Sequence, residues 1–274
     1  MPRPDMSAVH ARYRARLQHR KMSRKLRVFD TFAAIFAFAW RERGAILRLS
    51  WFPLLLSSLA WHLATGAGEL IAARLVAIAA WAVVAAALHR LILFGDRAPG
   101  TWLNIRFGKV EALFAILPAA YLVPTVVLPA LGVPTEFHLK GGPAMIMWVV
   151  MAVAIFFLAR FSLVFPIAVI ERRVNFAQAF ALSHANVWRM IGLWLVVTMP
   201  ALLVADAWQS VLLGLLKFTP AAMTEEQFDG SLLELAAVTY PFSILLGALC
   251  VGILSFSYKA MAGFAPDAAL TPKA

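Results

Sequence analysis

The sequence predicts an all-α polytopic membrane protein, with about six transmembrane helices arranged as three helical hairpins and with short interfacial helices. Of its 274 residues, 62% are hydrophobic and 14% are charged, whereas soluble domains carry about 25% charged residues. The charges are gathered between long apolar stretches, which lack the alternation of barrel strands. Because only helices and closed barrels satisfy every backbone polar group in lipid, these stretches indicate helices.

Six stretches are long enough to cross a membrane, which takes about 20 apolar residues. They are 45–65, 70–88, 111–131, 143–161, 190–213 and 233–256. The fourth could continue to residue 170, but a continuous helix would then bury Arg160 deep in hydrocarbon, which is costly. We therefore favour a break near Phe161, after which "SLVFPIAVI" bends at Pro166 and runs along the interface. Arg160 would then reach lipid phosphates, as would Arg90 at the matching end of the second span.

Cations lie almost entirely on one side of this arrangement. Nearly all arginines and lysines lie before the first span or in the segments that follow the even-numbered spans. The opposite connections hold only Lys140 and Lys217, against the acidic residues Glu69, Glu136, Glu225, Glu226, Asp229 and Glu234. This asymmetry predicts a multi-pass protein of a bacterial inner membrane with both termini in the cytoplasm.

The charge pattern also divides the chain into three parts. Residues 1–27 form a basic cytoplasmic arm, residues 28–262 the six-helix transmembrane domain, and residues 263–274 a cytoplasmic tail. The arm lacks the apolar stretch and small-residue cleavage site of a signal peptide. We expect it to contact anionic headgroups, at about 1 kcal/mol for each well-placed cation; a solvated tail is the alternative.

A loose pattern supports the three hairpins. In three cytoplasmic segments, a cation precedes a proline at a similar distance: Arg43 and Pro53, Lys109 and Pro118, Arg189 and Pro200. An internal repeat would explain this pattern, and a shared membrane composition would explain it equally simply.

Two further segments are predicted to be short interfacial helices. In "DTFAAIFAFAW", Asp30 can cap the N-terminus, and Asn175 can do the same for "FAQAFALSHANVW". Both are too short to span and have charged flanks, so each would lie at headgroup level. Alternatively, each forms the first turns of a long tilted span.

Signatures of enzymes are absent from the sequence. It contains no Gly-x-Ser-x-Gly elbow, no His-Glu-x-x-His motif and no Walker loop. The six histidines do not recur at metal-ligand spacings, and the single cysteine, Cys250, excludes an intramolecular disulfide. We therefore expect a non-enzymatic protein without catalytic residues, metal or cofactor.

Four polar residues are candidate intramembrane or headgroup contacts: Arg74, Asp206, Arg90 and Arg160. Arg74 and Asp206 both fall toward the external side, so a pair between spans two and five is geometrically possible. As a coupled polar site, that pair would fit a small transporter or permease subunit. A structural pair, or two side chains that reach the interface, is the simpler interpretation.

Several stretches resemble a known group of proteins. These are "FAWRERGAILRLSWFPLLL", "ALHRLILFGDRAP" and "ARFSLVFPIAVIERRVNFAQAFALSHANVWRMIGL". They resemble uncharacterised bacterial inner-membrane proteins that are similar to the membrane domain preceding some glycerophosphodiester phosphodiesterases. The resemblance covers roughly residues 29–260, and the soluble domain with its acidic metal cluster is missing here. It therefore implies a polytopic membrane module with an envelope-related role, and no phosphodiesterase activity.

The net charge of +11 fits contact with anionic lipid better than with nucleic acid in such a chain. The function we expect is to bind or organise anionic lipid or an unidentified membrane-protein partner.

Overall fold

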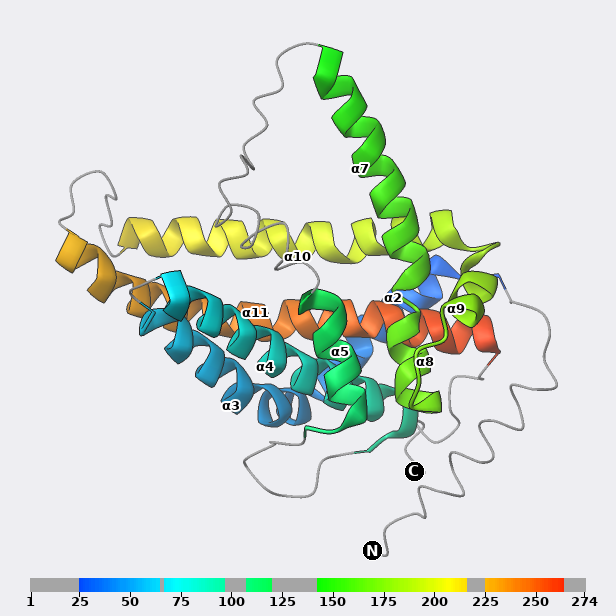
Figure 1. Cartoon of the computed structure of the whole chain (residues 1–274), viewed down its shortest axis with the longest axis horizontal. Helices are drawn as coiled ribbons and strands as arrows, with labels where there is room; N and C mark the ends of the chain where they lie inside the picture. The colour runs from blue at the N-terminus through cyan, green and yellow to red at the C-terminus, as the bar shows by residue number, and fades with distance from the viewer. Residues whose placement is uncertain (1–24, 65–66, 97–106, 120–141, 216–224, 264–274) are drawn as a thin grey trace, which may run out of the picture.

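The computed structural model describes residues 25–64, 67–96, 107–119, 142–215 and 225–263, and within them the secondary structure is entirely helical (Figure 1). This confirms the all-α prediction for the described residues. The basic arm and the tail lie almost wholly outside them. The helices are α2 (Val28–Arg41), α3 (Arg43–His62), α4 (Ala67–Phe94), α5 (Lys109–Ala119), α7 (Gly142–Phe161), α8 (Val164–Glu171), α9 (Phe176–Ser183), α10 (Val187–Leu215) and α11 (Glu225–Ala262).

Within the part of the chain that the structure describes, four helical segments are long and apolar enough to cross a membrane: Ile71–Phe94, Ala152–Glu171, Val187–Trp208 and Phe242–Ala262. They overlap the second, fourth, fifth and sixth predicted spans. The first predicted span falls on α3, where Arg48 and three serines dilute the apolar stretch. The third begins in α5 and continues outside the described residues. Six spans therefore stay a prediction.

The buried core is concentrated at one end of the long helices. The buried positions of the long helices are concentrated from the start to the middle of α3, in the second half of α4, in the first half of α10 and in the second half of α11. These halves meet because α3 and α10 pack on α4 and α11 respectively, and each pair runs antiparallel (Figure 1). We call these four halves, together with α2, α5, α8 and α9, the packed end. It contains the largest fully buried side chains, among them Ile35, Leu88, Met190, Leu249 and Tyr258.

The other halves of the long helices leave large apolar side chains exposed. We call this region the open end; its exposed residues include Leu55, Leu59, Leu75, Val76, Leu202, Leu203, Val204 and Trp208. Soluble monomers rarely expose contiguous apolar patches of more than a few hundred Å². Surrounding hydrocarbon removes this cost, which agrees with the candidate membrane segments on α4 and α10.

Close packing ties α2 and α4 to α11. The Phe38 and Phe256 ring centroids lie 5.7 Å apart, and a Cβ added at Gly252 would meet the Ile35 Cγ2 atom at 3.1 Å. A Cβ at Gly247 would overlap the Trp81 ring. Glycines at these two positions therefore let the helices approach closely, as in many membrane helix pairs.

The start of α2 corrects one prediction. The helix begins at Val28 with Arg27 at its N-cap, so Asp30 lies inside the first turn and is not the cap. There its carboxylate can still interact favourably with the positive end of the helix dipole, and it forms an exposed ion pair with Arg27 at 3.5 Å. The prediction that α2 is separate from the following span is confirmed, because α3 begins only after Glu42.

The predicted break near Phe161 is confirmed, although it does not follow the expected path. The bend lies at Ser162 and Leu163, between α7 and α8. Pro166 has no N–H to offer the Ser162 carbonyl, which instead accepts from the Phe165 N–H at 3.3 Å. The prediction that this segment runs along the interface is wrong: α8 packs against α4, α5, α9 and α11, and Ile167 and Ile170 are fully buried. A helix that is apolar on every side belongs in a core.

Candidate functional site

Arg160 is buried at the C-terminal end of α7, with 6% of its surface exposed. Its Nη2 donates to the Phe180 carbonyl at 2.9 Å, and its Nε donates to Ser183 Oγ at 3.3 Å. The guanidinium carbon also lies 3.1 Å from the centroid of the Phe180 ring. Phe180 and Ser183 belong to the last turn of α9, where carbonyls lack partners within the helix and attract cations. Arg160 therefore joins α7 to α9.

This position differs from the predicted contact with lipid phosphates. Side chains at a membrane edge can reach outward, but Arg160 finds its acceptors inside the protein, on a helix that follows after α8. The contacts with α9 offset part of the cost of burying this charge.

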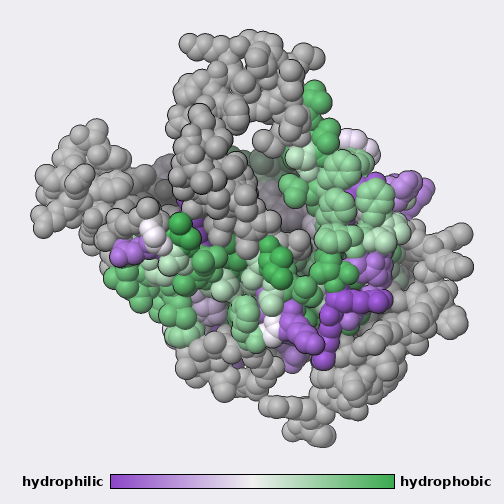
Figure 2. Space-filling model, viewed as in Figure 1, coloured by the Kyte–Doolittle hydropathy of each residue, from purple (hydrophilic) through white to green (hydrophobic). Residues whose placement is uncertain are grey.

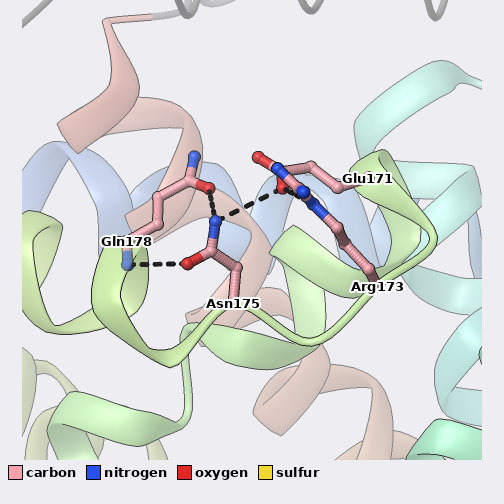
Figure 3. A network of polar contacts seen from close by, with 4 residues as sticks. All are labelled: Glu171, Arg173, Asn175 and Gln178. Atoms are coloured by element: carbon pink, nitrogen blue, oxygen red, sulfur yellow. Dashed lines mark hydrogen bonds and ion pairs between the residues drawn. The ribbon is translucent and has the colours of Figure 1, made fainter.

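The turn between α8 and α9 carries a polar network (Figure 3). The Gln178 N–H donates to Asn175 Oδ1 at 3.1 Å, which confirms Asn175 as the N-cap of α9. Asn175 Nδ2 donates to Gln178 Oε1 at 3.0 Å and to Glu171 Oε2 at 3.4 Å. Arg173 Nε donates to the same Glu171 oxygen at 3.0 Å. The network fixes the direction in which the chain leaves α8 and enters α9.

Arg172, in the same turn, has a φ of 56° and is the one non-glycine residue with positive φ in the described chain. It ends α8 at a position where glycine is usual, because a Cβ is disfavoured in the left-handed region. Its side chain is exposed.

Two buried polar pairs join α4 to its neighbours. Arg90 Nη2 lies 2.5 Å from Glu111 Oε1, and the Glu111 side chain is 3% exposed. The other Glu111 oxygen accepts from the Gly108 N–H at 2.9 Å. One residue earlier, His89 Nδ1 lies 2.6 Å from Ser255 Oγ on α11. Arg90, predicted as a headgroup contact, is thus paired with a carboxylate and is one-quarter exposed.

Arg74 and Asp206 both lie at the open end, on α4 and α10; that this end is the external side stays a prediction. Arg74 is half-buried and Asp206 is exposed. Within the described residues no ion pair joins the two side chains. The transporter alternative stays a prediction.

A groove of about 700 Å³ lies between α7 and α10, with walls from α8 and α9. We call it the α7–α10 groove. Its apolar lining includes Ile155, Leu158, Phe161, Phe176, Trp194 and Leu195. The hydroxyl of Ser162, a polar lining residue, donates to the Ala159 carbonyl at 2.9 Å. The groove therefore offers apolar contact and few polar groups.

Sequence reasoning missed the partners of the buried arginines. Glu111 carried a signal, because it is the one acidic residue of the segment 107–119 and follows the connection from Arg90. Ser183 and the Phe180 carbonyl carried none, since neither a serine nor a backbone carbonyl identifies its partner in sequence.

No family model, curated protein or solved structure matches this chain. The resemblance to the membrane domain associated with glycerophosphodiester phosphodiesterases stays a prediction.

Proposed function

We propose that this chain is a non-enzymatic, multi-pass protein of a bacterial inner membrane that binds or organises anionic lipid. The observation that carries this proposal is the exposure of arginine side chains at the packed end. Arg27, Arg41 and Arg173 expose 84%, 44% and 72% of their side chains there. Exposed cations of this kind attract the anionic lipids of a cytoplasmic leaflet.

Aromatic side chains at the same end support the proposal. Trp40 is 74% exposed at the end of α2, and the Arg43 guanidinium carbon lies 4.8 Å from its ring centroid. Trp188 is 75% exposed in the first turn of α10. Tryptophans and arginines at headgroup level are typical of a membrane interface. On the face drawn in Figure 2, hydrophilic side chains at the end of α8 adjoin hydrophobic surface over α4, α5 and α7.

The proposed topology follows from the same features. The last turn of α2 packs on the C-terminal part of α11, where the Phe38 and Phe256 rings meet, and this supports placing both ends of the transmembrane domain on one side. The basic segments assign that side to the cytoplasm. We retain six spans in three hairpins, with α2 and α9 at headgroup level; an unidentified membrane-protein partner on the open end is compatible with this arrangement.

The test is the thermal stability of the full chain in nanodiscs. Discs of phosphatidylcholine are compared with discs in which one-third of the lipid is phosphatidylglycerol. We expect a higher Tm in the anionic discs and loss of most of the difference at 1 M salt, where the Debye length is about 3 Å. Equal Tm values in both discs at low salt would refute anionic-lipid binding.

A further inference from the structure

The α7–α10 groove is a hollow in the exposed apolar surface of the described helices. Its volume of about 700 Å³ falls within the range of about 300–1,000 Å³ that ligand sites occupy. Leu158, Phe165, Phe176 and Trp194 contribute walls from α7, α8, α9 and α10 in turn. Since the Ser162 hydroxyl is already bonded to a carbonyl, the lining suits hydrocarbon and offers little to a polar solute.

The surroundings of the groove identify the source of that hydrocarbon. The lining residues of α7, α8 and α10 all fall within the candidate membrane segments Ala152–Glu171 and Val187–Trp208. A groove between such segments opens toward bilayer lipid, so the occupant with the right chemistry is an acyl chain.

The α8–α9 turn supplies charge complementary to a phosphate. Phe176, which lines the groove, follows Arg172 and Arg173 closely in the chain. The exposed Arg172 side chain has no ion-pair or hydrogen-bond partner among the described residues, whereas Arg173 shares Glu171 with Asn175. Arg172 also keeps a left-handed backbone that would suit glycine better. Residues held in such conformations cluster at ligand sites.

We propose that the α7–α10 groove holds one acyl chain of an anionic phospholipid, whose phosphate is bound by Arg172 and Arg173 at the α8–α9 turn. This rests on the proposed function, since it assigns a site to the anionic lipid named there. Hydrocarbon contact would retain the chain, and the two guanidinium groups would select the headgroup charge.

The experiment measures the affinity of the full chain for its first bound phosphatidylglycerol by native mass spectrometry, with phosphatidylcholine as the neutral reference. Leu195→Trp narrows the groove. Leu203→Trp is the matched control, because Leu203 is 68% exposed on the same helix and does not line the groove. We expect Leu195→Trp to weaken binding of both lipids at least tenfold and Leu203→Trp to change it less than twofold.

Two further variants test the headgroup. Arg172→Gly removes the cation and relaxes the backbone, so a folding defect would not explain lost binding. We expect it to lower the preference for phosphatidylglycerol about fivefold, and Arg172→Lys to keep most of that preference. Soluble glycerol phosphate at millimolar concentration should not displace the lipid; displacement would mean that the headgroup alone binds and would overturn the acyl-chain assignment.

The outcomes separate the two proposals. If the wild-type chain does not distinguish phosphatidylglycerol from phosphatidylcholine, the proposed function fails. If it does, but Leu195→Trp and Leu203→Trp bind alike or Arg172→Gly keeps the full preference, the function survives and this site is wrong.

Discussion

Replacing Arg160 tests whether a buried cation without a carboxylate partner stabilises this fold. Arg160→Met keeps an unbranched apolar side chain and removes the guanidinium. The variant loses a 2.9 Å bond to the Phe180 carbonyl, a longer 3.3 Å bond to Ser183 Oγ, and the contact with the Phe180 ring. Hydrogen bonds to charged groups contribute about 1.5–3 kcal/mol, and a desolvated cation–π contact about 2 kcal/mol.

These contributions are opposed by two others. Burying a cation costs several kcal/mol, and Ser183 Oγ donates to the Phe180 carbonyl at 3.1 Å, so that carbonyl keeps a partner in the variant. We expect a net loss of about 2–3 kcal/mol for Arg160→Met. Arg160→Lys should lose about 1–2 kcal/mol, because one ammonium cannot reproduce the planar fork and the stacking.

The assay is equilibrium unfolding of the full chain in mixed micelles, with hydrogen exchange of the α9 amides as a local readout. Arg48→Met is the matched control, since Arg48 is an exposed cation on α3, away from the junction of α7 and α9; we expect a change within about 0.5 kcal/mol. An Arg160→Met protein as stable as the wild type, with unchanged exchange in α9, would refute the reasoning, because desolvation would then equal or exceed the gain from the contacts.

Two other predictions concern the packing of α4. Arg90→Met should destabilise the protein more than Glu111→Gln does. The methionine variant leaves a buried carboxylate without its cation, at a cost of about 3–5 kcal/mol, whereas the glutamine of the other variant can still accept from a backbone N–H. In a double-mutant cycle measured by chemical unfolding, additive losses of stability would argue against coupling of the two residues. Gly247→Ala should lower the Tm, because the added Cβ overlaps Trp81, and should cost about 1–3 kcal/mol of stability. In Gly192→Ala the added Cβ has nothing within 4 Å, so this variant should be more stable by up to about 1 kcal/mol. Equal Tm changes for the two alanine variants would contradict the packing of α4 on α11.

Local chemistry made some features predictable from sequence. The Asn175 cap could be predicted because the accepting side chain of Asn175 and the donating N–H of Gln178 lie only three residues apart in the chain. The break near Phe161 could be predicted because a continuous helix would bury Arg160 in hydrocarbon, and Pro166 removes an N–H from the helix that follows. The capping prediction failed at Asp30, since a carboxylate serves the first turn as well as the cap.

Long-range pairing could not be predicted in the same way. An apolar segment such as 164–170 fits both an interface and a core, and only its neighbours α4, α5 and α11 decide between them. Likewise, a lone arginine such as Arg160 in an apolar stretch indicates that burying its charge is costly, but the sequence does not show which acceptors offset this cost. The six-span count depends partly on residues outside the described ranges, so the sequence still carries that prediction alone.

The contacts of Arg160 and the α7–α10 groove depend on one another. Of the α7 side chains whose burial the structure describes, Ala159 and Arg160 are the buried ones, both in the last turn. In Figure 1, α7 extends away from α10 and α11, which run side by side. Its direction is therefore set mainly at one end, where Arg160 holds it to α9. The same junction brings Phe161 within 5.6 Å of Phe176 and so forms one wall of the groove. Arg160, which the sequence predicted to reach lipid phosphates, thus holds α7 to α9 and helps to shape the α7–α10 groove.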